Sequence, residues 1–311
     1  MNQFLSQDLI KNIPAARRAF ISQMLKAAGA TILLASPLAC GAGKPKPANK
    51  ALTVQDIIDL IIKDIPGAPF GSTVDTIKSG SGDQPVTGII STMFATVPII
   101  EEAARQKANF IIAHEPSFYN HTDDTNWVAN NNVLRQKREL LNKHKIAIWR
   151  FHDYWHTVRP DGILYGVLKK AGWTSYYKSG NRMIDIPSVS LQDLAAHLKK
   201  SLGISHVKVI GNLTQSCQRI GVIPGAAGGQ TQVSFVENEK PDVLVVGEVH
   251  EWETAEYIRD AQALGGKTSL IILGHSVSEE PGMAWLVDWL QPKIPGIPIR
   301  HIESGDPFTW L

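Results

Sequence analysis

The chain has 311 residues, of which 43% are hydrophobic and 19% charged, a balance typical of a globular protein that excludes disordered, collagen-like and coiled-coil chains. The 31 Lys and Arg residues nearly balance the 29 Asp and Glu residues, and no Lys/Arg block forms a basic stripe, so we expect no nucleic-acid partner. Two cysteines, Cys40 and Cys217, are too few for a disulfide framework or a cysteine-based zinc finger.

Residues 1–40 have the features of a twin-arginine export signal. The paired Arg17 and Arg18 precede an apolar run at 27–38 that ends just before Cys40. This run is about half of the roughly 20 residues that a membrane span needs, so we expect no membrane span. We expect export by the twin-arginine route to the periplasm or the extracellular space. An amphipathic N-terminal helix is the alternative for this segment, and lipid attachment at Cys40 is a second possibility for the exported protein.

Residues 41–50 are rich in Pro and Lys and are predicted to be a linker, and from residue 51 onward apolar strands alternate with amphipathic helices. This alternation predicts an α/β fold with helices on both faces of the sheets, that is, α/β/α layers. In chain order we predict a helix at 54–63, a loop at 67–83, a strand at 86–95, a helix at 97–106, a strand at 109–113, a helix at 133–144, a strand at 146–151, a helix at 163–171, short strands within 173–186, a helix at 191–202, strands at 207–210 and 219–223, a Gly-rich turn at 225–229 that opens a helix, a strand at 242–246, a helix at 254–263, a strand at 269–273, a helix at 283–290 and a strand at 299–303.

Ionisable side chains gather where the predicted strands end, which is where sites form in sheets of this kind. Imidazole nitrogen and carboxylate oxygen are ligands for divalent cations, so these ends predict a metal site. Pro116 ends its strand, which allows both residues before it to reach one site. Three strands finish in His114-Glu115, in His152-Asp153-x-x-His156 and in His275-x-x-x-Glu279, and a fourth finishes in Glu248-x-His250-Glu251.

The Gly-rich turn at 225–229 follows a strand and opens a helix, so its free N–H groups are candidates for holding an anion. The segment lacks the Gly-x-Gly-x-x-Gly spacing and any Lys-Ser/Thr pair. We therefore interpret it mainly as a tight turn.

The strand-end motifs resemble those of the Nif-three-like family, also known as the GTP cyclohydrolase I type 2 or dinuclear metal-centre hexameric protein family. That family has a strand ending in His-His-Pro, then His-Thr-Asn-Leu-Asp, and later Gly-His-x-x-x-Glu-x-Pro-Gly. The corresponding stretches here are NFIIAHEP at 109–116, HDYWH at 152–156 and GHSVSEEPG at 274–282. The resemblance covers about residues 52 to 305. It implies a domain at 51–311 of two related halves, about 51–190 and 191–311, with mixed sheets and a metal site between them.

Two departures mark the chain as a divergent His-Glu-Pro branch. Glu115 replaces the second His of His-His-Pro, and His156 occupies the register of the family's ligand Asp. The resemblance implies that two divalent ions, Zn, Mn or Fe, are held by His114, Glu115, His156, His275 and Glu279. His152 is the candidate for acid/base catalysis or for orienting a ligand, and Asp153 for either role.

The resemblance implies a homo-hexamer and a metal-dependent hydrolase, similar to GTP cyclohydrolase I type 2. We predict that a metal-activated water attacks a phosphoester or nucleotide-type small molecule. The alternative is a non-enzymatic metal-binding protein that serves as an oligomeric scaffold or binds a partner.

Overall fold

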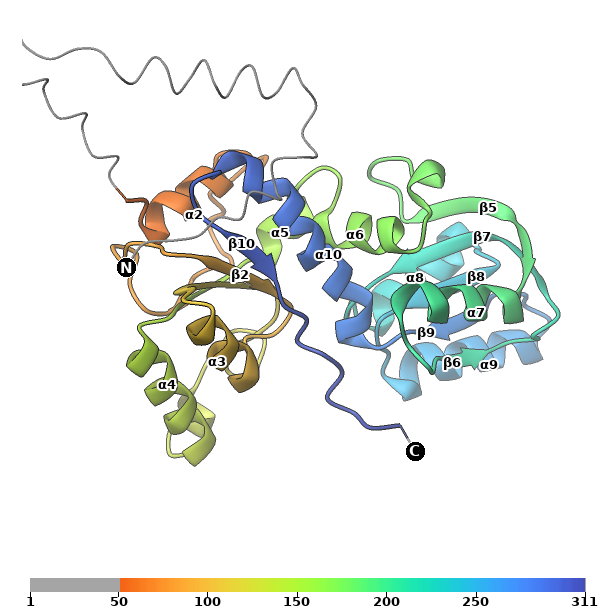
Figure 1. Ribbon diagram of the computed structural model, residues 1–311. Helices are drawn as coiled ribbons and strands as arrows, with labels where there is room; N and C mark the ends of the chain where they lie inside the picture. The colour runs from red at the N-terminus through yellow and green to blue at the C-terminus, as the bar shows by residue number, and fades with distance from the viewer. Residues whose placement is uncertain (1–50, 311) are drawn as a thin grey trace, which may run out of the picture. The chain divides into compact units, whose positions relative to one another are not determined.

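The computed structural model describes residues 51–310, and the predicted export signal and linker lie outside the described residues. Two five-stranded mixed sheets organise the chain (Figure 1). The first has the order β1-β4-β3-β2-β10, with β1 (Ile77–Ser79), β2 (Ile89–Thr92), β3 (Phe110–Ala113), β4 (Ala147–Arg150) and β10 (Ile299–His301). The second has the order β5-β7-β8-β9-β6, with β5 (Met183–Ser190), β6 (Lys208–Ile210), β7 (Ser216–Ile223), β8 (Val243–Val246) and β9 (Ser269–Ile272).

Helices cover these sheets, and α2, α3, α4, α6 and α7 begin at a side chain that caps the first turn. The Thr96 hydroxyl accepts the backbone N–H of Ile99 at the start of α3, and the Asp161 carboxylate accepts two N–H groups at the start of α6. No helix among residues 51–310 is long and apolar enough to cross a membrane. The helices are α2 (Val54–Ile62), α3 (Val97–Arg105), α4 (Asn132–His144), α5 (Asp153–Thr157), α6 (Gly162–Lys170), α7 (Leu191–Leu202), α8 (Gly229–Glu239), α9 (Glu256–Ala263) and α10 (His275–Leu290), with short helical turns at Asn126–Val128, Thr174–Tyr176, Glu251–Ala255 and Gln291–Lys293.

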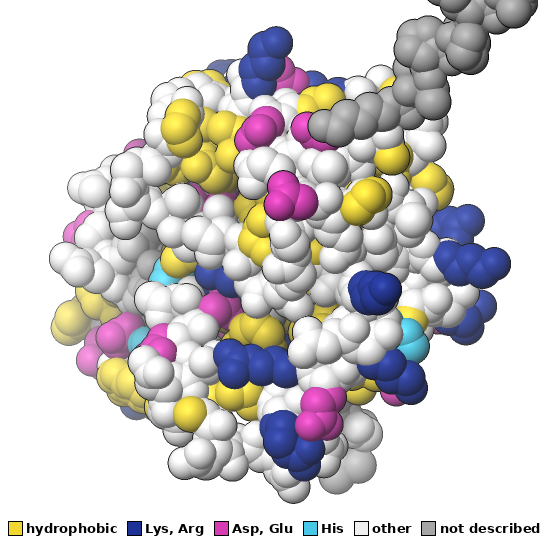
Figure 2. Space-filling model, turned by 90° about the vertical axis from the view of Figure 1, so that its left-hand side faces the viewer, with side chains coloured by type: hydrophobic (Ala, Val, Ile, Leu, Met, Phe, Trp, Pro, Cys, Tyr) yellow, Lys and Arg dark blue, Asp and Glu magenta, His cyan; other side chains and the backbone are white. Residues whose placement is uncertain are grey.

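Each sheet has an apolar cluster on both faces, which confirms the predicted α/β/α layers. Along β3, Phe110 and Ile112 belong to one buried cluster, and the alternating Ile111 and Ala113 belong to another. The same alternation separates two clusters along β8. Fully buried parallel strands explain why these segments are continuous apolar runs in the sequence. On the face shown in Figure 2, acidic and basic side chains are interspersed, without a continuous stripe of Lys and Arg.

The chain crosses between the two sheets at different points from those that the sequence suggested. The predicted halves divide near residue 190, whereas β5 at Met183–Ser190 already belongs to the second sheet. The last segment then returns to the first sheet, because α10 follows β9 and leads to β10, which pairs in parallel with β2. Figure 1 shows α10 running from the second sheet to the first.

Helix α10 begins at His275, whereas the sequence predicted a start at 283. Pro281 therefore lies inside the helix. A proline in a helical pattern predicts a boundary, since it lacks an N–H and crowds the preceding turn. Here tertiary contact overrides that preference. A Cβ atom on Gly166 of α6 would lie 2.4 Å from Cα of Gly282, so the two helix backbones touch and hold α10 against α6.

Candidate metal centre

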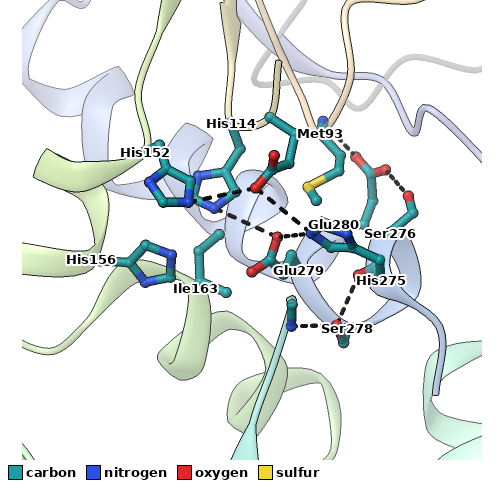
Figure 3. A network of polar contacts seen from close by, with 12 residues as sticks. Met93, His114, His152, His156, Ile163, His275, Ser276, Ser278, Glu279 and Glu280 are labelled. Atoms are coloured by element: carbon teal, nitrogen blue, oxygen red, sulfur yellow. Dashed lines mark hydrogen bonds and ion pairs between the residues drawn. The ribbon is translucent and has the colours of Figure 1, made fainter. Parts of the chain in front are cut away.

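Six side chains from three segments converge at the carboxyl ends of the central strands. Strands β3 and β4 are paired in parallel, which brings the residues after them to the same edge of the first sheet. α10 carries its two side chains to that edge from the end of β9. Figure 3 shows the imidazole rings of His114 and His275 directed toward the carboxylate of Glu279. The six residues are His114, Glu115, His152, His156, His275 and Glu279.

The ligand-type atoms of these residues lie close enough to share ions. Oε2 of Glu279 lies 3.2 Å from Nε2 of His275 and 3.6 Å from Nε2 of His114. Oε1 of Glu115 lies 3.5 Å from Nε2 of His152. Two overlapping groups of three residues have ligand atoms that all lie within 4.8 Å of one another. One group is His114, His152 and His156, and the other is His114, Glu115 and Glu279.

Three of the atoms at this centre are buried without a hydrogen-bond partner among the described residues. They are Nε2 of His114, Nε2 of His275 and Oε2 of Glu279. Such atoms are costly to bury, and a bound cation is the usual compensation. The donor set, imidazole nitrogen and carboxylate oxygen, is also the one that Zn, Mn and Fe accept in proteins. The residues present therefore fit a metal centre.

His114 is held in the form that a metal ligand needs. Its Nδ1 lies 3.0 Å from the carbonyl oxygen of Phe151, which can only accept, so Nδ1 carries the proton and Nε2 presents its lone pair. Burial, followed by the nearby His152 and His156, lowers the pKa of His114 well below its usual value. The ring is therefore neutral at physiological pH.

Carboxylates orient the other two rings of the histidine group. Nδ1 of His152 lies 2.8 Å from Oδ1 of Asp153, whose Oδ2 accepts the hydroxyl of Thr73 and the N–H of Val74. Nδ1 of His156 lies 3.1 Å from Asp161. Both rings thus direct Nε2 away from their carboxylate partner, the arrangement that positions metal-binding histidines.

A further buried carboxylate, Asp75, fixes the turn that carries His152. Its two oxygens accept the backbone N–H groups of His152, Asp153 and Tyr154 at 2.8, 3.1 and 2.8 Å. Burial raises the pKa of Asp75 to about 6, although these hydrogen bonds oppose the shift. Asp75 therefore fixes the backbone from which the His152 and Asp153 side chains extend.

His275 is the most strongly polarised group of the centre. Burial opposes its charge, but the negative carboxylates of Glu115, Glu248 and Glu279 around the ring outweigh this and raise its pKa to about 12. Three carboxylates thus compete for one imidazole when no other cation is present. A bound metal ion takes over that charge compensation, and His275 is then a neutral ligand.

The five ligands predicted from the sequence all reach this centre, and His152 joins them. The prediction assigned His152 to acid/base or orienting work, whereas its Nε2 lies within the His114 and His156 group. Asp153 is placed to orient His152. Sequence reasoning missed Asp75, which lies in a predicted loop, and Asp161, for which only its position before a helix was a signal. It also missed Arg150, which is hidden in an apolar strand.

The fourth strand end contributes only one residue. Glu248 lies 3.3 Å from Nδ1 of His275, while His250 and Glu251 are exposed and pair with Glu253 and Lys208. In the Gly-rich turn, the N–H of Gly229 donates to the Glu253 carboxylate at 3.1 Å. One N–H group that the turn offered to an anion is thus taken by the chain itself.

Comparison with known proteins identifies a family for the chain. Residues 53–307 match the family model described as Duf34/NIF3 (NGG1p interacting factor 3). A protein named GTP cyclohydrolase 1 type 2 homolog from Clostridium perfringens is 20% identical over 275 residues, which cover 84% of this chain and 100% of that protein. The protein of the same name from Neisseria meningitidis serogroup B is 25% identical over 250 residues, which cover 77% and 90%.

Solved structures share the fold at low sequence identity. The hypothetical protein SA1388 of Staphylococcus aureus superposes with a TM-score of 0.69 at 19% identity and covers 84% of this chain and 99% of that one. The protein ybgI, titled as of unknown function, has a TM-score of 0.68 at 17% identity, with coverages of 82% and 100%. A Bacillus cereus protein related to NIF3 has a TM-score of 0.66 at 16% identity, with coverages of 83% and 99%. The family match spans nearly all described residues, and the chain belongs to the Duf34/NIF3 family.

Proposed function

We propose that the protein is a metal-dependent hydrolase with two divalent ions, Zn, Mn or Fe, and a small-molecule substrate of phosphoester or nucleotide type. The observation that carries the proposal is the set of buried atoms without hydrogen-bond partners, Nε2 of His114 and of His275 and Oε2 of Glu279. Six side chains, four imidazoles and two carboxylates, would hold the ions. The names of the curated relatives, GTP cyclohydrolase 1 type 2 homolog, support an enzyme weakly, at 20–25% identity.

When bound, two divalent ions supply a water of lowered pKa and positive charge that stabilises a leaving oxygen. The chain's own residues prepare the place where this happens. Asp153 and Asp161 hold Nδ1 of His152 and His156, so that both rings present Nε2 to the centre. Nη2 of Arg150 lies 3.5 Å from Oε2 of Glu115, and the positive charge of Arg150 favours the ionised form of that carboxylate.

The sequence predicted an acid/base role for His152, and we assign that role to a different residue. His152 is a ligand because its Nε2 lies with those of His114 and His156. Glu248 is half exposed beside His275 and its pKa is held low, first by the hydrogen bond from His275. Because this carboxylate lies beside His275 and outside the set of proposed ligands, we assign to Glu248 the acceptance of a proton at the rim of the centre.

Assembly and location are also part of the proposal. The resemblance to a family of ring-shaped proteins supports a homo-hexamer, and light scattering of the purified protein tests it. The paired Arg17 and Arg18 support twin-arginine export to the periplasm or the extracellular space, with Cys40 as a lipid attachment point in the alternative. Cell fractionation tests this, and mature protein found only in the cytosol contradicts it.

The test of the hydrolase is turnover of 4-nitrophenyl phosphate, bis(4-nitrophenyl) phosphate and GTP by the metal-loaded protein. We expect turnover of at least one ester, and its loss together with bound metal in His275→Ala. A matched control is His144→Ala, at the end of α4 and away from the centre. Turnover that survives in metal-free His275→Ala contradicts the proposal. If chelation unfolds or dissociates the protein and no substrate is turned over, the non-enzymatic scaffold is the better account.

A further inference from the structure

The metal centre opens into a cavity of about 810 Å³. Glu115 and His275, two of the proposed ligands, line one end of it. The remaining lining comes from the loops after β2 and β3, from Ala226 of the Gly-rich turn, from Lys137 of α4 and from the C-terminal segment. Its larger apolar side chains are Phe94, Val97, Pro98, Pro116, Tyr119 and Pro307.

The apolar lining is continuous with the proposed ligands. The ring of Phe94 meets the imidazole of His275 edge to face, with centroids 6.0 Å apart at 74°. Val97 and Tyr119 also line this cavity, and the two residues are 39% and 48% exposed. Apolar walls around a few convergent polar groups are the usual form of a small-molecule site.

Positive charge for a highly charged substrate is scarce in this cavity. Lys137 is the only Lys or Arg among the described residues that line it. Its Nζ already donates to the carbonyl oxygen of Ser117 at 2.6 Å, and only 5% of the residue is exposed. Arg150 is completely buried and donates to the carbonyl oxygens of His114 and His121, so its guanidinium is not free to reach a ligand.

We infer that the cavity binds the apolar body of a phosphomonoester, of which an aryl phosphate is the simplest example, rather than a nucleoside triphosphate. The inference rests on the proposed function, because it places the phosphoryl group at the metal centre. A phosphomonoester carries about two negative charges, all on the phosphoryl group that lies at the divalent ions, and its remaining body is free to meet the apolar walls. A triphosphate carries about four negative charges. The negative charge that the ions do not offset would lie in an apolar cavity whose described lining has no free Lys or Arg side chain.

Phosphonates test the inference without any chemical step. Phenylphosphonate and methylphosphonate share the anionic head and differ in the apolar body. We expect calorimetric titration of the zinc-loaded full chain to show phenylphosphonate binding at least tenfold more tightly than methylphosphonate, and more tightly than GTP. Val97→Asp should reduce the preference for the phenyl compound to less than threefold and leave the zinc content unchanged.

A matched control is Val133→Asp. Val97 and Val133 are both exposed and both lie in the first turn of a helix, where an acidic residue is tolerated, but only Val97 lines the cavity. The control should keep the phenyl preference. Equal affinity for the two phosphonates, no binding of either by the zinc-loaded protein, or tighter binding of GTP overturns the inference.

Hydrolysis separates this inference from the proposed function. Phenyl phosphate and methyl phosphate are offered to the same zinc-loaded protein. A phenyl preference in binding with no turnover of either ester, of the 4-nitrophenyl esters or of GTP overturns the hydrolase and supports the cavity assignment. Turnover of an ester together with equal affinity for the two phosphonates supports the hydrolase and overturns the cavity assignment.

Discussion

Nη2 of Arg150 lies 3.5 Å from Oε2 of Glu115, and the Arg150 side chain is completely excluded from solvent. The same guanidinium faces Asp123 at 3.7 Å and donates to the carbonyl oxygen of His114 at 3.2 Å. Burial opposes ionisation of Glu115, but neighbouring cations, His275 first and Arg150 among them, hold its pKa below the usual value. Arg150 thus supports an acidic residue at the position where the resembled family has His.

Arg150→Met should lower the free energy of unfolding of the metal-free protein by about 3–5 kcal/mol, because it leaves buried carboxylates without their partner. Urea denaturation measures this. The control is Arg135→Met, whose partner Glu139 is exposed, and the change there should stay below about 1 kcal/mol. Equal effects of the two substitutions would show that Arg150 does not compensate the buried acids.

Asp153→Asn and Asp161→Asn should each weaken metal binding by about 10- to 100-fold, because an amide holds the imidazole Nδ1–H less firmly than a carboxylate does. Asn is also a good N-cap, so the start of α6 at Asp161 should survive the change. Competition against a chromophoric chelator gives the affinities. Asp288→Asn is the control, since Asp288 pairs with Lys169 on the surface and should leave the affinity unchanged. Wild-type affinity in both test variants refutes the orienting role.

Gly282→Ala should destabilise the protein by about 1–3 kcal/mol or more, because a Cβ atom there would lie 2.6 Å from Cα of Ile163, and backbone cannot move aside cheaply. It should also weaken metal binding, since Glu279 lies on the same helix less than one turn away. Thermal unfolding and metal titration measure the two effects. Gly296→Ala has open space around the new methyl group and should change neither. A neutral Gly282→Ala would mean that the close helix contact does not position α10.

Lys137, which is not one of the proposed metal ligands, should make the free energy of unfolding depend on pH. Burial lowers its pKa from 10.5 to about 8, against the opposing charge of Asp123. Between these two values the unfolded chain binds more protons than the folded chain, so the free energy of unfolding should rise with pH. The gain is at most about 3 kcal/mol.

Urea denaturation at pH 7.5 and pH 10 measures this contribution as the difference between wild type and Lys137→Met. The difference should shift in favour of wild type at the higher pH. Lys143→Met removes an exposed lysine of the same helix and should show no such shift. A difference that is independent of pH contradicts the burial of a charged Lys137.

The sequence was most informative where a signal is local. Apolar runs that end in His114-Glu115 or His152 identify strand ends directly, because parallel strands are buried on both faces and polar residues begin where burial stops. The five predicted ligands reach one centre for that reason. The alternation of strands and helices predicted the layers, and the resemblance to a family added the two halves with mixed sheets.

Long-range partners could not be predicted in this way. Asp75 lies in a loop, and only the folded chain brings it to the backbone of His152. Arg150 sits inside an apolar strand, where its burial depends on Glu115 and Asp123 from another segment. The start of α10 was also hidden, because Pro281 breaks the helical pattern while contact with α6 maintains the helix.

The most direct test of the account is the metal content per chain, measured by elemental mass spectrometry on protein purified without chelator. We predict about two equivalents of Zn, Mn or Fe in the wild type and in His144→Ala, and less than one in His275→Ala. A wild-type value near zero that persists after all three metals are offered would contradict the account.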